Sequence, residues 1–319
     1  MGFLKFIQFQ LQEKIQPYSA FHIVSFIIMI ALCVALCVFC RNIKEKKLSR
    51  ILMIIWGVLV FLEIYKQFVF SYGFDSDGNI HWHYSWYAFP YQFCATPLTF
   101  IPFIALNKGS NKVSAFIKEG MIVFCCTFNL FAGLAVMIAP GDVFETYNLG
   151  ICVHTMIHHG MQMVLGIYLY VYYHGKLQYW SYLKALPIFG FFLVNAMILN
   201  LIVPKFNGGE TFNMFFISPY FDCTLPVLST IYPKGKAAAA LPMTLMVFEG
   251  ASGMSMYVLV RVKATRAYVG KTVEEAEAYI AELSDFELDA ATLEKAAGGG
   301  CGHCYGACDP DCVENWMPL

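Results

Sequence analysis

Seven long apolar stretches occupy most of this 319-residue chain and limit how it can fold. A membrane-spanning helix needs about 20 predominantly apolar residues. Inside a bilayer the backbone must satisfy its own hydrogen bonds, and a helix does so within one segment. The sequence therefore predicts an all-α, polytopic membrane helical bundle of about seven transmembrane helices. The predicted spans are 20–40, 51–72, 88–106, 113–138, 150–173, 182–203 and 237–260.

The composition excludes an ordinary soluble globule. Hydrophobic residues make up 58% of the chain and charged residues 13%, whereas about 25% of the residues of a soluble domain are charged. The formal net charge is -1, so no basic surplus points to nucleic acid as a partner. Membrane lipids are the expected partners.

The distribution of Lys and Arg predicts the orientation in the membrane. Short loops on the cytoplasmic side carry an excess of these residues. The loops after the second and fourth predicted spans contain none, whereas the loop after the sixth contains Lys205, Lys234 and Lys236. Basic residues gather after the first, third, fifth and seventh spans: Arg41, Lys44, Lys46, Lys47, Arg50, Lys108, Lys112, Lys176, Arg261, Lys263 and Arg266. We expect the N-terminus outside and the C-terminus in the cytoplasm.

The composition changes after Arg266 and divides the chain into three parts. Residues 1–266 form the predicted membrane domain. Residues 267–300 are acidic, begin with a capping box at Thr272 to Glu275, and continue with apolar residues at helical spacing. This pattern predicts a helix that is either solvated or docked on a protein partner. Residues 301–319 form a Cys-rich tail.

Four tail cysteines are spaced like metal ligands: Cys301, Cys304, Cys308 and Cys312. Four thiolates suit a tetrahedral zinc ion, and they suit an iron–sulfur cluster less well. The tail has few apolar residues, so bound metal would be its main source of order. The membrane domain shows no pattern that indicates a cofactor.

The loop after the sixth predicted span has an unusual middle. Residues 211–219 read TFNMFFISP, which is too apolar for a free loop. An exposed stretch of this kind would leave several large apolar side chains in water. We expect this segment to dip into the protein or to lie along the membrane interface.

Three histidines stand in the fifth predicted span: His154, His158 and His159. Ionisable residues at membrane depth are costly and often mark function. His154 and His158 share one helix face because they are four residues apart, and His159 points about 100° away. Three interpretations stay open: metal ligation by His154 and His158, general-base chemistry, or hydrogen bonding inside the bundle.

Cys94 stands at the head of the third predicted span, in the segment from Pro90 to Pro97. Each proline lacks an amide donor and loosens the helix, which can expose Cys94 to a cavity. A thiol paired with histidine can become a nucleophilic thiolate. The alternative is a cysteine that only packs between helices.

The second predicted span carries Glu63 and Lys66, which are three residues apart and can form an ion pair. Such a pair inside a bundle either links helices or belongs to a substrate path. Together with His154, His158 and Glu249, it forms the set expected of a proton-coupled path.

Three sequence patches together resemble a known family. They are Pro90 to Cys94, His158-His159-Gly160 leading into Ile167-Tyr168-Leu169, and Phe212-Asn213-Met214 followed by Ser218-Pro219 and Tyr232-Pro233. In order and separation they resemble the YwaF family of bacterial integral membrane proteins. That family is similar to the eukaryotic transmembrane protein 164, an acyltransferase that moves polyunsaturated acyl chains onto ether phospholipids. The resemblance covers residues 15–260.

The resemblance implies cysteine–histidine acyl transfer within a bacterial cell membrane. Carried over by position, Cys94 is the nucleophile and His159 the base, with His158 as its nearest substitute. Asn213 is the residue that orients the site. A lipid acyltransferase is thus the first functional hypothesis. A proton-coupled transporter is the second, and a membrane protein that senses metal or redox state through its Cys-rich tail is the third.

Overall fold

Long apolar helices dominate the structure, as the sequence predicts. The computed structural model describes residues 2–221, except 145, 174–175 and 178–180. Its α-helices are α1 (Gly2–Ile7), α2 (Ala20–Phe39), α3 (Glu45–Val69), α4 (Thr96–Leu106), α5 (Lys112–Phe124), α6 (Leu130–Ile138), α7 (Leu149–Tyr173) and α8 (Tyr182–Ile202). The only sheet among the described residues is a hairpin of β1 (Tyr72–Phe74) and β2 (Ile80–Trp82). The predicted all-α class is confirmed.

Four helical segments of the described chain are long and apolar enough to cross a membrane. They are Ala20–Phe39, Glu45–Val69, Lys112–Ile138 and Tyr182–Lys205. A shorter apolar helical segment covers Phe93–Leu106. The fifth predicted span, helix α7, is not among these segments. The seventh predicted span, the acidic segment and the Cys-rich tail lie outside the described residues. The count of seven therefore stays a prediction.

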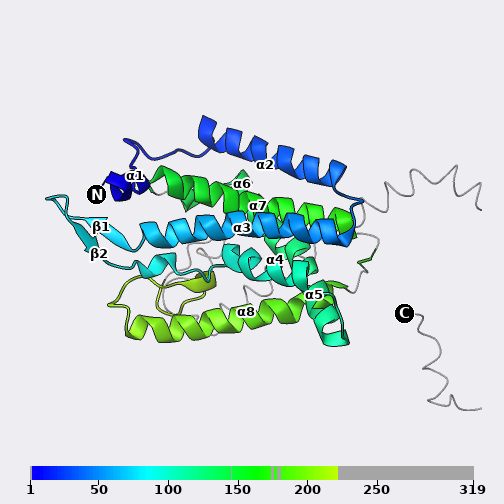
Figure 1. The fold of residues 1–319 in the computed structure, drawn as a ribbon. Helices are drawn as coiled ribbons and strands as arrows, with labels where there is room; N and C mark the ends of the chain where they lie inside the picture. Colours follow the sequence, from blue (N-terminus) through cyan, green and yellow to red (C-terminus); the bar gives the residue numbers. More distant parts are fainter. Residues whose placement is uncertain (1, 145, 174–175, 178–180, 222–319) are drawn as a thin grey trace, which may run out of the picture. The chain divides into compact units, whose positions relative to one another are not determined.

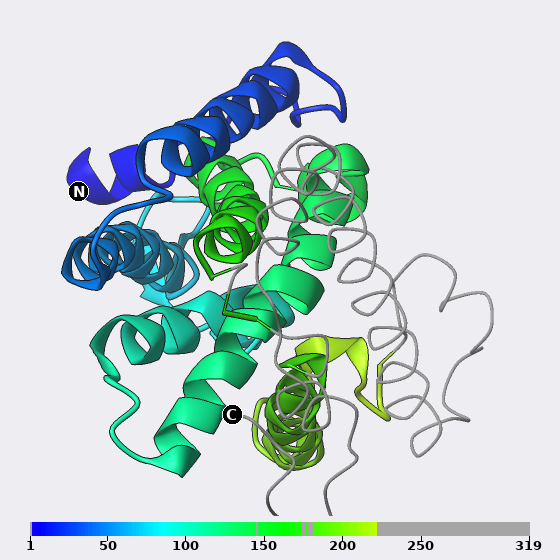
Figure 2. The same cartoon turned by 90° about the vertical axis from the view of Figure 1, so that its right-hand side faces the viewer.

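Helix α7 is the centre of the bundle. It is 25 residues long, and most of its side chains are buried. It packs against α2, α3 and α6 and also contacts α5. Figure 2, which looks along the bundle, shows α7 enclosed by α2, α3 and α6. The three histidines therefore lie on a helix whose faces meet different neighbours.

The third predicted span is shorter than expected. Helix α4 begins only at Thr96, after a 3-10 turn at Phe93–Ala95, and not at residue 88. Pro90 cannot donate a backbone hydrogen bond and disfavours helical geometry in the residue before it. Residues 89–92 consequently run as an irregular segment that leads Cys94 into the bundle.

A π-helical segment joins α5 to α6 within the predicted fourth span. Residues Cys125–Asn129 form this wider turn, and all five are buried. Segments of this kind are rare and often occur at functional sites. Here the Thr96 hydroxyl donates to the Asn129 carboxamide oxygen at 3.0 Å, which ties α4 to the π-helical segment.

The hairpin and α1 lie at one end of the bundle, as Figure 1 shows. The Gln8 amide donates to the carbonyl oxygens of Val69 and Tyr72, and the Tyr72 hydroxyl donates to that of Leu4. These hydrogen bonds hold the N-terminal segment against the end of α3. They lie at the end of the bundle where the segment 83–92 begins.

The segment after α8 folds back into the protein. Phe212, Met214 and Ile217 are fully buried. The Asn200 side chain on α8 donates to the Met214 carbonyl at 2.9 Å and accepts from the Met214 amide at 2.7 Å. The prediction that this apolar loop dips into the protein is confirmed.

Candidate active site

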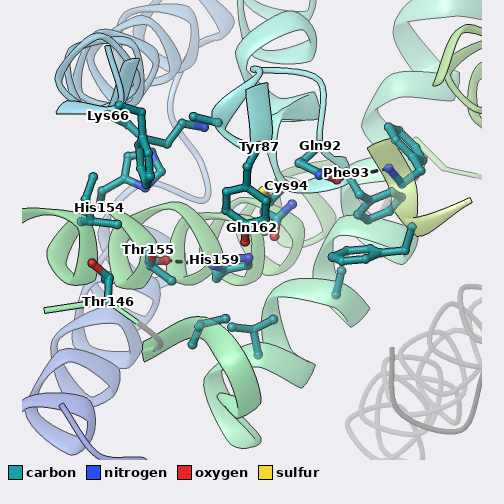
Figure 3. Close-up of a pocket in the computed structure, with 18 of the residues that line it drawn as sticks. Lys66, Tyr87, Gln92, Phe93, Cys94, Thr146, His154, Thr155, His159 and Gln162 are labelled. Carbon is teal, nitrogen blue, oxygen red and sulfur yellow. Dashed lines mark hydrogen bonds between the residues drawn. The ribbon is translucent and has the colours of Figure 1, made fainter. Parts of the chain in front are cut away.

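A cavity of about 690 Å³ opens between α7, α8 and the irregular segments before α4 and after α8. Its lining is mostly apolar and includes Phe93, Phe189, Leu193 and Phe215. The polar side chains that line it include those of Lys66, Gln92, Cys94, His154, His159 and Gln162. Figure 3 shows these polar residues converging from α3, the segment before α4, and α7. An apolar cavity with a few convergent polar groups is the usual form of a small-molecule site.

Cys94 reaches the cavity because the chain is not yet α-helical at that position. It lies in the 3-10 turn Phe93–Ala95, one turn before the regular part of α4. Its side chain is partly buried and lines the cavity. The prolines on either side of this turn thus place a thiol at the wall of a cavity rather than in a helix–helix contact.

His159 lines the same cavity from α7. Its Nδ1 lies 2.9 Å from the carbonyl oxygen of Thr155, one turn earlier on the helix. A carbonyl oxygen only accepts, so Nδ1 carries the proton and donates. The neutral ring then keeps an unprotonated Nε2, which is the nitrogen that a general base needs. Within the described residues, no hydrogen bond links the Cys94 thiol to His158 or His159.

His158 points away from the cavity. It is buried at 3% exposure, and its Nε2 lies 3.3 Å from the Leu59 carbonyl oxygen on α3. Its ring stacks on that of His154 with centroids 4.1 Å apart. His158 and His159 are neighbours in the sequence, but their side chains therefore lie on different faces of α7. Of the two histidines predicted as the base, only His159 lines the cavity.

A charged cluster joins α3 to α7 beside the cavity. The Lys66 ammonium lies 2.8 Å from Glu63 Oε1, which confirms the predicted ion pair. The Gln67 amide donates to the same oxygen at 2.6 Å, and His154 Nε2 lies 3.4 Å from Oε2. The carboxylate of Glu63 is thus shared among three partners from two helices.

Tyr84 supports this cluster from the segment between β2 and α4. Its hydroxyl donates to the Gln67 carboxamide oxygen at 2.7 Å. Burial, and secondarily the negative charge of Glu63, raises the pKa of Tyr84 to about 12. The phenol therefore stays protonated at neutral pH and remains a donor, which fixes the orientation of the Gln67 amide.

Asn213 does not line the cavity. Its carboxamide oxygen accepts from the Ser218 amide at 2.8 Å, which closes the turn after α8. Its backbone carbonyl accepts from the Gln92 side chain at 3.1 Å, and the Phe215 amide donates back to Gln92. Asn213 therefore contacts the site through Gln92, which stands two residues before Cys94.

The sequence also matches a known protein family. A model of the TMEM164 family matches residues 17–260. This protein belongs to the TMEM164 family. No curated protein and no solved structure matches the chain. Family membership and the apolar helices make this TMEM164-family chain an integral membrane protein, and they confirm the resemblance carried by its three sequence patches.

Two glutamines of this family member gain importance only in the structure. Gln162 is fully buried, lines the same cavity as Cys94 and His159, and has a carboxamide oxygen without a hydrogen-bond partner in the described residues. Gln92 fixes the segment after α8, as described above. The sequence offers only a weak indication of these two residues, since each is an uncharged polar residue within a strongly apolar stretch.

The backbone beside the cavity is strained in one place. Phe215 and Phe216 are consecutive non-glycine residues with φ of 57° each, and both line the cavity. Backbone of this kind costs of the order of 1–3 kcal/mol per residue and persists only where surrounding contacts impose it. The hydrogen bonds from Gln92 and Asn200 supply those contacts.

The tail ligands Cys301, Cys304, Cys308 and Cys312 lie outside the described residues.

Proposed function

We propose that this protein is an integral membrane acyltransferase that acts on phospholipids, with Cys94 as nucleophile and His159 as base. The Cys94 thiol gives its proton to His159 Nε2 as the sulfur attacks an acyl ester carbonyl. The C–O bond of the donor breaks, and its oxygen takes the proton from His159. A hydroxyl of the acceptor lipid then attacks the thioester, which releases the thiol and yields the new ester.

One observation carries this proposal: Cys94 and His159 line the same cavity, and His159 holds its proton on the nitrogen that faces Thr155. The second ring nitrogen is therefore free to accept a proton. The two side chains make no direct hydrogen bond within the described residues, which is common in enzymes without substrate, where such contacts tighten only on binding.

The lining of the cavity fits the proposed substrate. Phe93, Phe189 and Phe215 offer apolar surface for an acyl chain, and Leu193 extends it along α8. Gln162 supplies a carboxamide beside the reacting groups. Among the described residues its Nε2 makes a single, long contact of 3.5 Å with Asn129, so the amide is available to the ester oxygen.

The test is acyl transfer in proteoliposomes, followed by mass spectrometry with an isotope-labelled acyl donor lipid. Cys94→Ala and His159→Ala should each abolish transfer. Cys37→Ala and His81→Ala are matched controls, because Cys37 lies on α2 outside the cavity and His81 is an exposed hairpin residue. Transfer that persists in both site variants, or that falls equally in both controls, contradicts the proposal.

We further propose the orientation and location that the basic loops and the resemblance support. The N-terminus lies outside a bacterial cell membrane and the C-terminus in the cytoplasm. A membrane-impermeant thiol reagent applied to intact cells should leave the tail cysteines unlabelled. Labelling of Cys301 without lysis would contradict this orientation.

The charged cluster supports an alternative function, a proton-coupled transporter. Glu63 and His154 are buried, Lys66 is partly buried beside them, and Lys66 and His154 line the cavity. Buried ionisable groups at membrane depth often form a proton path. Glu249, the remaining member of the predicted path, lies outside the described residues. A pH-driven flux into proteoliposomes that is lost with Glu63→Gln would favour this function over acyl transfer.

For the C-terminal part we propose zinc binding by Cys301, Cys304, Cys308 and Cys312, and docking of the acidic segment 267–300 on a protein partner. The spacing of the cysteines and the low apolar content of the tail support the first of these. Replacing the four cysteines by serine in the full chain should remove one bound zinc. An unchanged zinc content would contradict it.

A further inference from the structure

A second set of residues that can ligate a metal lies within the bundle, and one of them, His154, lines the same cavity as Cys94 and His159. Glu63 on α3 and His154 and His158 on α7 are all buried. Each offers one ligand atom, and these three atoms lie within 4.8 Å of one another. We propose that Glu63, His154 and His158 bind a divalent transition metal of the zinc class.

The donor chemistry is the first support for this site. Two imidazoles and one carboxylate are a ligand set that zinc uses when a fourth position stays open. His154 and His158 are four residues apart on α7, so their rings lie on the same face, and they stack at 4.1 Å. A single residue from the neighbouring helix, Glu63, completes the set.

The distances are the second support. His154 Nε2 and Glu63 Oε2 are 3.4 Å apart, whereas a charge-assisted hydrogen bond between such groups is about 2.7–2.9 Å long. Two ligands that each lie about 2.0–2.1 Å from a tetrahedral ion are separated by about 3.3 Å. The contact between His158 Nε2 and the Leu59 carbonyl is also long, at 3.3 Å. The spacing of His154 and Glu63 therefore fits an ion between these two ligands better than it fits a direct hydrogen bond.

The surroundings of Glu63 are the third support. Lys66 and Gln67 both contact Oε1, which leaves Oε2 directed at His154. Gln67 is itself held by the Tyr84 hydroxyl and donates to the Ala88 carbonyl at 2.6 Å. Hydrogen bonds of this kind to a ligating carboxylate fix its orientation toward the metal.

Lys66 gives the site a distinctive property. Its positive charge, 2.8 Å from the carboxylate, opposes the binding of a cation. Removing that charge should therefore strengthen metal binding. If the cluster were only a network of ion pairs, removing Lys66 would instead leave a buried carboxylate without its partner. The two interpretations therefore predict different results for the same substitution: tighter metal binding if the site holds an ion, and a loss of stability without metal binding if it does not.

The experiment measures metal content and needs no activity. The full chain is purified in detergent with its four tail cysteines replaced by serine, so that the tail cannot contribute metal. We expect about one Zn²⁺ or Co²⁺ per chain, as for a single three-ligand site, with the visible absorption of tetrahedral Co²⁺ and no thiolate charge-transfer band. His154→Ala/His158→Ala should lose the ion, and the exposed pair His81→Ala/His83→Ala should keep it.

Because the double variant can lose its fold, two milder substitutions complete the test. Glu63→Gln keeps the shape of the side chain and should weaken Co²⁺ binding by about tenfold or more, since it removes the only negative ligand. Lys66→Met should tighten it by about tenfold. Failure of the Ser-tail protein to bind either ion, equal binding by Glu63→Gln, or weaker binding by Lys66→Met would each overturn the site. None of these results depends on whether the protein transfers acyl groups.

Discussion

The two regions around α7 differ in how their polar groups are used. In the charged cluster of Glu63, Lys66, His154 and His158, the contacts cross from α3 to α7, and both oxygens of the carboxylate have partners. At the cavity wall, His159 uses only Nδ1, and it does so within its own helix. The groups that cross between helices fix the geometry of the bundle. The polar groups at the cavity wall that make no contact across helices are the ones available for chemistry.

The largest expected effect separates the two neighbouring histidines. His159→Gln should lower the rate of acyl transfer by about 10²–10⁴-fold, because it removes the proposed base. His158→Gln should retain most of the transfer rate but lower the thermal unfolding midpoint, since His158 is buried between α3 and α7. Transfer rates in proteoliposomes and unfolding in detergent check both. The opposite pattern would make His158 the base.

The next effect concerns the stability of the charged cluster. Glu63→Ala should destabilise the protein by about 3–5 kcal/mol, because it leaves the Lys66 ammonium, on a side chain that is only 15% exposed, without its counter-charge. Glu45→Ala removes a pair with Lys118 in which the Glu45 side chain is 61% exposed, and it should cost less than about 1 kcal/mol. Equilibrium unfolding measures both. Similar losses for the two variants would mean that the cluster does not hold α3 to α7.

A smaller effect is expected where α6 meets the helix turn of His159. A Cβ at Gly133 would lie 2.6 Å from the His159 carbonyl oxygen and 2.8 Å from Gln162 Cβ. Gly133→Ala should therefore push α6 away from α7, at a cost of about 1–3 kcal/mol, and slow transfer.

Gly57 on α3 is the matched control for this substitution. A Cβ there would meet nothing within 4 Å. Gly57→Ala should be neutral or stabilise the helix by up to about 1 kcal/mol. A stability loss as large as that of Gly133→Ala would show that the helical glycines are not distinguished by the α6–α7 contact.

The smallest effect tests the segment after α8. Gln92→Met removes two hydrogen bonds to residues 213–215 and should cost about 1–2 kcal/mol. It should also lower the transfer rate, since the strained backbone at Phe215 loses support. Gln16→Met, at an exposed position with one hydrogen bond to Lys14, should change neither quantity. An unaffected Gln92→Met variant would remove the proposed positioning role.

Much of the fold could be predicted from the sequence because a bilayer imposes simple demands on it. The bounds of α2, α8 and the combined α5–α6 segment follow from apolar length alone, within a residue or two. The start of α4 was predicted too early, since the effect of Pro90 on the preceding backbone outweighed the apolar character of residues 88–92. The ion pair of Glu63 and Lys66 was predictable because both residues lie on one helix.

The candidate site was less accessible to prediction. The sequence offered Cys94, His158 and His159 as chemical groups and could not decide which histidine shares a cavity with the thiol. Spacing placed His154 and His158 on one face, but it did not show that this face meets Glu63. Gln92 and Gln162 carried no distinctive motif. Their roles depend on residues that are more than 30 positions away in the chain.

The amino-acid sequence is enough to predict a membrane helical bundle with a rare concentration of ionisable groups on one span. Hydrophobic length and the cost of burying charge act locally, so they can be read along the chain. That His159 lines the cavity of Cys94 while His158 packs against α3 could be seen only once the helices were packed together. That choice depends on the rotation of α7 about its axis, which is set by its packing against α2, α3 and α6 together.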